Sequence, residues 1–420
     1  MNRVVQFSRR VRILRYLGTG VLIACGLIGG KILFEKSSLG HRIEVWTYEF
    51  LQGQLTAIET DPLPVVVVDI SQIPGGSAGQ VTSRDQLTKL IYAIAKEQPK
   101  AIAVDGDFSP TPTGWVDPDN DPDFFDFCLK MRRDNHVPVF LGVHRTLASS
   151  PSTWLGLDEY KELAVVLLAP DDTTRLPVWI RQTNGQWKLP ALSTALAEVY
   201  RGGALPQPPG WLQSVTETIG EPPSDAIRND SGVIAVTTAI VNYSKLELIQ
   251  LTTLPSISPQ SVAEAGTLFR NRVVIIGKGK DATDRYNVPG RDATVAGVFL
   301  HACAAYTFIK EPLYELNTRF RLGADLFFSV AIILAVGWFR LWGGDKLPWH
   351  QRQSKYTWIA ATIVFAAGVI FVRFLALLWL DFVPLILALL LHPYVEKAID
   401  RIFRRRNQRT AGFQIRGEEL

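Results

Sequence analysis

The longest apolar runs lie near the two ends of the chain. Residues Tyr16–Phe34 contain a single charge, Lys31, and Leu322–Leu341 carry charges only near the ends of the run. A third run, Thr357–Leu391, is 35 residues long. Because a helix crosses a bilayer with about 20 predominantly apolar residues, each run is long enough to form a transmembrane helix.

The third run is too long for one span. As a single helix it would measure about 52 Å, whereas the hydrocarbon core of a bilayer is about 30 Å thick. The segment Trp379-Leu380-Asp381-Phe382-Val383-Pro384 combines an interfacial Trp, a charge and a Pro, so we predict a turn there. This gives a third span at residues 357–378 and a short, tilted fourth span at residues 381–394. A turn at Arg373 is the alternative.

Between these runs, short apolar segments alternate with helical patterns. Segments typical of buried strands are Pro64–Ile70, Ala101–Asp105, Val137–Val143, Leu163–Leu168, Ser231–Val241 and Arg272–Ile276. Apolar residues at helical spacing occur in Gln86–Glu97, Phe124–Asp134, Leu189–Arg201 and Val298–Ile309. We therefore predict an α/β fold, with a mixed, largely parallel-type sheet and flanking helices in one domain at residues 35–318.

Charge is unevenly distributed along the chain. Residues 35–318 carry 33 acidic and 24 basic residues, whereas the remainder carries 7 acidic and 20 basic residues. Basic residues beside transmembrane helices stay in the cytoplasm, and the basic clusters share one side only if there are four spans. We expect a multi-pass membrane protein with a cytoplasmic N-terminus (1–15), spans at 16–34, 322–341, 357–378 and 381–394, a basic cytoplasmic tail (395–420) and an extracytoplasmic domain at 35–318. This arrangement argues against nucleic-acid binding.

Other interpretations of the chain ends stay open. A cleaved signal peptide is the rival interpretation of Tyr16–Phe34, although no A-x-A-like site follows it. Leu22-Ile23-Ala24-Cys25 loosely resembles a lipoprotein box, and Ser8-Arg9-Arg10 a twin-arginine signal. The tail either determines topology or binds anionic lipid or a partner. Cys128 and Cys303 are the two cysteines of the middle region, and the sequence does not decide whether they pair.

Several segments match a known family. They are Val65–Ile70, Lys100–Phe108, Val241–Tyr243, Phe269–Gly277, Asp284, Pro289 and Gly297–Ala302. Together they resemble the second type of CHASE domain, an extracytoplasmic sensory module of bacterial cyclases and histidine kinases. The layout is also similar, with one helix before the domain and three after it, and the resemblance covers residues 10–395.

The resemblance implies a sensor in the bacterial plasma (inner) membrane. Such domains commonly precede a cytoplasmic kinase or cyclase, whereas only about 25 residues follow the last predicted span here. We therefore expect the protein to bind a small-molecule ligand outside the cell and to relay a signal to a separate membrane or cytoplasmic partner. The sequence identifies no cofactor.

Acidic residues mark candidate ligand contacts. Asp69, Asp105 and Asp107 lie at or just past the ends of predicted strands, where open α/β sheets bind ligands. Clustered carboxylates there could bind a cation or an amine, or share a proton. Strand-end hydrogen bonding is the alternative. Asp284 and His301 are further ligand candidates in the family-like segments; His301 could sense pH or serve as a packed structural residue.

Two other loops carry weaker signals. Asp117, Asp119 and Asp121 are weak metal candidates, because the EF-hand positions that require Gly and Glu hold Pro122 and Cys128. A loop leading into a helix N-cap is the alternative. The segment Gly277-Lys278-Gly279-Lys280 follows a strand but lacks the spacing of a phosphate-binding loop.

The remaining candidates concern the membrane and the type of function. Arg373 lies in or near the third span, and Asp381 is its candidate partner unless Arg373 snorkels to the interface. We expect no enzyme, because the chain lacks motifs such as G-x-S-x-G and H-E-x-x-H. A structural or assembly subunit of a membrane complex is the alternative to a sensor. A third hypothesis is an extracytoplasmic hydrolase with Asp69, Asp105 and Asp107 as acids and bases.

Overall fold

The computed structural model describes residues 18, 21–22, 25–26, 28–34, 36–55, 62–71, 82–110, 115–144, 154–167, 173–182, 188–217, 225–229, 232–253, 262, 265–279, 284–342, 349–391, 394–395, 397–398 and 401. The arginine-rich residues 1–15, the Ser8–Arg10 motif and most of the basic tail lie outside this set. The chain divides into two compact units. One is Leu55–Tyr314, and the other combines Met1–Gln54 with Glu315–Leu420.

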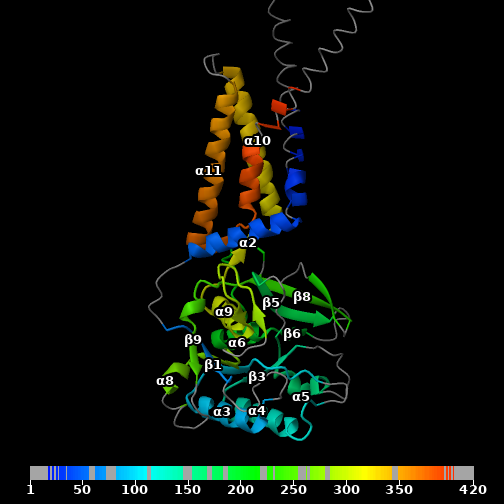
Figure 1. Ribbon diagram of the computed structural model, residues 1–420, viewed down its shortest axis with the longest axis vertical. Coiled ribbons are helices and arrows are strands. Elements are labelled where there is room, and N and C mark those ends of the chain that lie inside the picture. Colours follow the sequence, from blue (N-terminus) through cyan, green and yellow to red (C-terminus); the bar gives the residue numbers. More distant parts are fainter. Residues whose placement is uncertain are drawn as a thin grey trace, which may run out of the picture. The chain divides into compact units, whose positions relative to one another are not determined.

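A six-stranded sheet forms the centre of the unit Leu55–Tyr314 (Figure 1). Its order is β4 (Ala164–Val166), β3 (Val139–Val143), β2 (Ala101–Val104), β10 (Val273–Gly277), β1 (Val65–Asp69) and β9 (Gln250–Thr253). All five neighbouring pairs are parallel. Parallel strands covered on both faces read as continuous apolar runs, which is why the sequence predicted most of them. The predicted α/β fold with a largely parallel-type sheet is confirmed.

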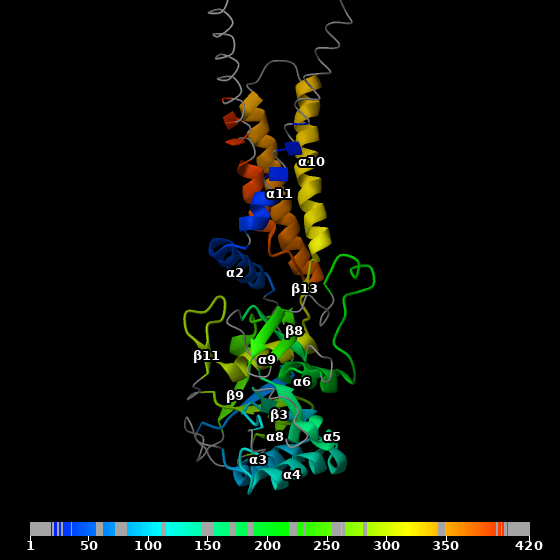
Figure 2. The ribbon, with the colours of Figure 1, turned by 90° about the vertical axis from the view of Figure 1, so that its right-hand side faces the viewer.

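Helices cover both faces of this sheet (Figures 1 and 2). On one face, α3 (Arg84–Lys96) and α4 (Asp121–Asp134) pack against strand residues such as Val66, Ile102 and Val274. On the other face lie α6 (Leu192–Arg201) and α9 (Gly297–Ile309), which pack against each other. Short helices of this unit among the described residues include α5 (Asp158–Lys161) and α8 (Gly266–Phe269). Nearly every side chain of α9 is buried, so it is a core helix of this unit.

A second, antiparallel sheet was not predicted. Its order is β6 (Lys188–Pro190), β5 (Arg175–Gln182), β8 (Gly232–Ile240) and β7 (Asp225–Asn229). The predicted strand Ser231–Val241 therefore belongs to this sheet and not to the parallel one. A short antiparallel ribbon of β11 (Arg285–Tyr286) and β12 (Val295–Ala296) leads into α9. β7 is mostly polar, whereas β5 carries the alternating buried residues Leu176, Val178 and Ile180, a strand signal that the prediction missed.

The other unit contains mainly helices. They include α2 (Ser38–Gly53), α10 (Thr318–Trp342) and α11 (Trp349–Leu375). The strand β13 (Tyr314–Glu315) precedes α10, and β14 (Leu377–Leu378) follows α11. The N–H of Leu316 donates to the carbonyl oxygen of Leu378 at 3.1 Å. A further apolar helix covers Phe382–Leu391.

The turn after α11 begins earlier than predicted. The helix ends at Leu375, and Ala376 adopts a positive φ of 51°. Among the described residues, Lys355–Leu375 is the one helix that is long and apolar enough to cross a membrane, with a mean hydropathy of 2.2. The described residues of the first apolar run are helical, and α10 covers the second run.

Candidate functional site

The carboxyl ends of three neighbouring strands bring acidic residues together. Asp69, the last residue of β1, pairs in register with Gly277, the last residue of β10. Asp105 directly follows β2, and its N–H donates to the carbonyl oxygen of Ile276 at 2.7 Å. The chain leaves β1 and β2 for α3 and α4 on one face of the sheet but leaves β10 for α9 on the other face, so β10 marks a topological switch point. Open α/β sheets bind ligands at such a switch point.

Asp69 has a structural role at this edge. Its Oδ1 accepts hydrogen bonds from the backbone N–H of Ser71 at 3.0 Å and from the Ser71 hydroxyl at 2.5 Å. The same oxygen accepts the N–H of Gly279 at 3.0 Å. The side chain is buried and ties β1 to the loop after β10. This geometry corresponds to the strand-end hydrogen bonding that was the alternative to ligand contact.

Two glycines allow close packing at the first turn of α9, Gly297 against the carboxyl group of Asp284 and Gly277 against Asp105 and Val298. A Cβ atom on Gly297, the first residue of α9, would lie 2.2 Å from Oδ2 of Asp284. A Cβ atom on Gly277 would lie 3.0 Å from Cβ of Asp105 and 2.9 Å from Cγ2 of Val298. A Cβ atom at either position would force the side chain of Asp284 or Val298 to shift, so glycine permits this close packing.

The two carboxyl groups influence each other electrostatically. Burial, and then the negative charge of Asp284, raise the pKa of Asp105 to about 8. Burial also raises the pKa of Asp284, while its own backbone N–H and the charges of His144 and Lys278 act in the opposite direction. Asp105 therefore keeps its proton at neutral pH and can donate a hydrogen bond. Asp105 as a residue is only partly buried.

Two histidines complete the cluster. His301 in α9 is 4% exposed, and burial followed by the nearby His144 lowers its pKa to about 4. The imidazole is thus neutral at pH 7. His144 comes directly after β3 and is exposed, and its N–H donates to the hydroxyl of Ser109 at 2.9 Å. Sequence analysis selected His301 but missed His144, although its position just past a predicted strand was an available signal.

Asp107 differs from the other predicted strand-end residues. It is exposed, and its Oδ1 accepts the N–H of Ser109 at 2.9 Å, which stabilises the turn after β2. We define the strand-end site as Asp105, His144, Asp284 and His301. Its carboxyl and imidazole groups can exchange hydrogen bonds and protons with a small polar ligand.

The candidate calcium loop contains a structural ion pair. Nε of Arg84 contacts Oδ1 of Asp121 at 2.6 Å, and both side chains are buried. Oδ2 of Asp121 accepts the N–H of Asp117, whose own carboxylate accepts the side chain of Asn120. Asp119 is exposed. In the part of the chain that the structure describes, no group of three or more His, Cys, Asp or Glu residues could hold a metal ion. The structure thus adds no support to the metal prediction.

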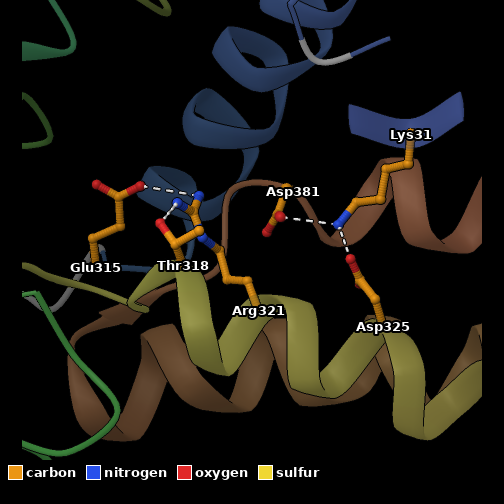
Figure 3. A network of polar contacts seen from close by, with 6 residues as sticks. All are labelled: Lys31, Glu315, Thr318, Arg321, Asp325 and Asp381. Atoms are coloured by element: carbon orange, nitrogen blue, oxygen red, sulfur yellow. Dashed lines mark hydrogen bonds and ion pairs between the residues drawn. The ribbon is translucent and has the colours of Figure 1, made fainter. Parts of the chain in front are cut away.

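The predicted pair of Arg373 and Asp381 is wrong. Nη1 of Arg373 donates instead to the backbone oxygen of Gln54 at 3.0 Å. Asp381 accepts Nζ of Lys31 at 3.0 Å, and the same Nζ contacts Oδ2 of Asp325 at 2.5 Å (Figure 3). Lys31, Asp325, Arg373 and Asp381 are all evident in the sequence, but no local pattern indicates which of them pair.

Lys31, Asp325 and Asp381 form a buried charge cluster. The side chains of Lys31 and Asp325 are 4% exposed and that of Asp381 is 13% exposed. A second ion pair lies further towards the start of α10, where Arg321 contacts Glu315 at 3.4 Å and Thr318 at 3.2 Å (Figure 3). Buried charges are costly unless they are paired, so the Lys31 cluster fixes the helices of this unit relative to one another.

Comparison with known proteins identifies the family. The family model for the CHASE2 domain matches residues 21–337. No curated protein and no solved structure matches the chain. CHASE2 domains are extracytoplasmic sensory domains. Since the match covers most of the chain, as the resemblance implied, this protein belongs to the CHASE2 domain family.

Proposed function

We propose that this protein is a membrane-anchored sensor that binds a small molecule at the strand-end site and relays the signal through its helices to a separate partner. The proposal rests above all on two relationships: the carboxyl group of Asp284 lies against Gly297, the first residue of α9, and its charge acts on Asp105. A ligand that binds these carboxyl groups changes the charge and hydrogen bonding at the start of this helix. A ligand shifts a conformational equilibrium only through such differential contacts.

The chain provides a short covalent connection from this site to the apolar helices. Ile309 ends α9 and Thr318 begins α10. Within the unit Leu55–Tyr314, the end of α9 is held by Arg201, which donates to the carbonyl oxygen of Ile309 at 3.0 Å, and by Thr307, whose hydroxyl accepts the N–H of Asn242 at 2.8 Å. A displacement of α9 is thus passed on to the residues that lead into α10.

Membrane anchoring is the second element of the proposal. The chain would cross the bacterial inner membrane four times, with both termini in the cytoplasm and residues 35–318 outside. Charge distribution and the apolar helix Lys355–Leu375 support this topology. The buried cluster adds further support. Lys31, Asp325 and Asp381 each lie near the predicted outer end of a different apolar segment, and they meet as this topology requires.

The partner and the type of activity complete the proposal. We propose that the site binds and does not catalyse. The output comes from a separate membrane or cytoplasmic protein that contacts the helices or the basic tail. A structural or assembly role in a membrane complex is the competing function, and it requires no ligand.

Affinity purification of the full chain from membranes tests this function. Proteins and small molecules that accompany the wild type are compared with those that accompany an Asp105→Asn, Asp284→Asn double variant, with Asp107→Asn as the exposed control. We expect a small molecule that is retained by the wild type and the control but lost from the double variant. The same set of molecules in all three samples contradicts ligand binding at this site. One stoichiometric membrane protein without any small molecule favours the assembly role.

A further inference from the structure

An apolar stripe runs along one side of α2. Leu39, Ile43, Trp46 and Phe50 follow one another at intervals of four, three and four residues, so they lie on one face of the helix. Leu39 is 56% exposed and Trp46 is 55% exposed. The helix begins at the cap residue Ser37, whose hydroxyl accepts the N–H of Gly40 at 3.1 Å.

The neighbouring side of α2 is buried. Its buried residues are Gly40, Thr47, Tyr48, Leu51 and Gln52. The helix therefore has one face fixed to the protein and an adjacent apolar face that the described residues leave largely open. Large apolar side chains that are exposed together on one face mark a surface that contacts another protein or a membrane.

The apolar stripe adjoins the candidate membrane span. The rings of Phe50 and Phe365 lie 5.6 Å apart, and Phe365 belongs to Lys355–Leu375. Phe365 lies in the middle of this span, and near its C-terminal end Arg373 donates to the backbone oxygen of Gln54, just past α2. α2 crosses the lower end of α11 in Figure 1 and does not run alongside it. Apolar side chains of α11 itself are exposed, among them Ile363 at 53% and Phe374 at 77%.

We propose that α2 lies in the outer membrane–water interface, with Leu39 and Trp46 inserted among the lipids. This inference rests on the membrane anchoring proposed above. A helix with one apolar face binds in the plane of the interface, and Trp is favoured at that depth. The exposed Arg42 beside the stripe and the exposed His41 on the opposite side of the helix reach water and lipid headgroups. The same lipid bilayer covers α11 and the stripe, because their exposed apolar surfaces are continuous at Phe50 and Phe365.

The location of α2 affects signalling as well as anchoring. α2 ends where the unit Leu55–Tyr314 begins. An interfacial α2 holds the start of the sensory unit at the membrane surface, so that a movement of α9 acts on α10 and is not dissipated by motion of the whole unit.

Fluorophores attached to single cysteines measure the depth of α2. The full chain, with the exposed Cys25 replaced by Ala, is reconstituted into vesicles of phosphatidylethanolamine and phosphatidylglycerol. Leu39→Cys and Trp46→Cys report on the stripe, and His41→Cys is the control on the other side of the same helix. We expect brominated lipids to reduce the fluorescence at positions 39 and 46, and aqueous iodide to reduce it at position 41.

A label at Ile363→Cys separates failure of this inference from failure of membrane anchoring. If brominated lipids quench position 363 while positions 39 and 46 respond to iodide like position 41, the interfacial α2 is wrong and anchoring stands. If iodide also quenches position 363, anchoring itself is wrong. If positions 39 and 46 respond to neither quencher and give self-quenching between labelled copies, a second copy of the chain covers the stripe and the lipid assignment is overturned.

Discussion

Lys31 and Asp325 are 294 residues apart in the sequence, yet their side chains form an ion pair of 2.5 Å that is almost completely buried. Asp381 binds the same ammonium group from a third segment. The three residues come from the N-terminal apolar helix, from α10 and from the turn after α11. The arrangement joins the chain before the sensory unit to the chain after it.

Replacing Lys31 by Met should destabilise the helical unit strongly. The substitution leaves the carboxylates of Asp325 and Asp381 buried without their cation, and breaking a buried pair costs about 3–5 kcal/mol. Asp325→Asn should lower the free energy of unfolding by less, because Lys31 still forms an ion pair with Asp381. Unfolding of the full chain in detergent measures both changes.

A matched control for this prediction lies on the surface of α3. Lys89 and Asp85 form an ion pair whose side chains are 58% and 66% exposed. Asp85→Asn should change the free energy of unfolding by less than about 1 kcal/mol. If Lys31→Met has an effect as small as that of Asp85→Asn, the cluster does not hold the helices together.

The pKa of Asp105 should fall when its charged neighbour is removed. Asp284 is the charge that helps to raise this pKa to about 8. Carbon NMR of Asp105 should therefore give a lower pKa in Asp284→Asn than in the wild type. Asp107→Asn should leave it unchanged, because the exposed Asp107 is not among the causes of the shift. A fall of similar size in both variants would contradict the assigned contact.

Asp105 should also make the stability of the protein depend on pH. Its pKa is higher in the folded state than in the unfolded state, where Asp titrates near 4. Between about pH 4 and pH 8 the folded state holds the extra proton, so stability falls as pH rises, by at most about 1.4 kcal/mol per pH unit. Asp105→Asn should flatten this slope, as measured by unfolding at a series of pH values. An unchanged slope rules out the raised pKa.

His301 should produce the opposite trend in acid. Burial lowers its pKa to about 4, below the value near 6.5 of the unfolded chain. The unfolded state therefore binds more protons between these values, and stability is lost as pH falls from about 6.5 to about 4. His301→Gln should be less sensitive to acid than the wild type in thermal unfolding scans. His41→Gln, at an exposed position, should match the wild type.

Gly277→Ala should disturb the strand-end site. The added methyl group would lie 2.9 Å from Cγ2 of Val298 and 3.0 Å from Cβ of Asp105. Overpacking of this kind costs about 1–3 kcal/mol and should displace Val298 and Asp105 from the end of β10. Thermal unfolding and the NMR signal of Asp105 measure the two effects. Gly203→Ala is the control, since nothing lies within 4 Å of its new Cβ atom; equal stability of the two variants would argue against this packing.

The sequence by itself determined the parallel sheet, the helices that cover it and the family. Strands such as Val65–Asp69 and Val273–Gly277 are buried on both faces, so their burial appears as local apolar runs. The charged chain ends and the apolar runs indicated a membrane topology for the same reason, since both are patterns of neighbouring residues. β7 was not predicted because it is short and mostly polar, and β5 because its apolar residues alternate along the strand and do not form a continuous run.

Only the tertiary structure decided which charges meet. Sequence analysis paired Arg373 with Asp381 because they are close in the chain, whereas the fold gives Asp381 to Lys31. The fold also brings the charge of Asp284 close enough to affect Asp105, and it places His144 in the strand-end site. Hydrophobic periodicity can be recognised within a single helix or strand. The partner of a buried charge instead depends on packing between segments that are hundreds of residues apart. Local sequence patterns therefore do not predict which charges pair.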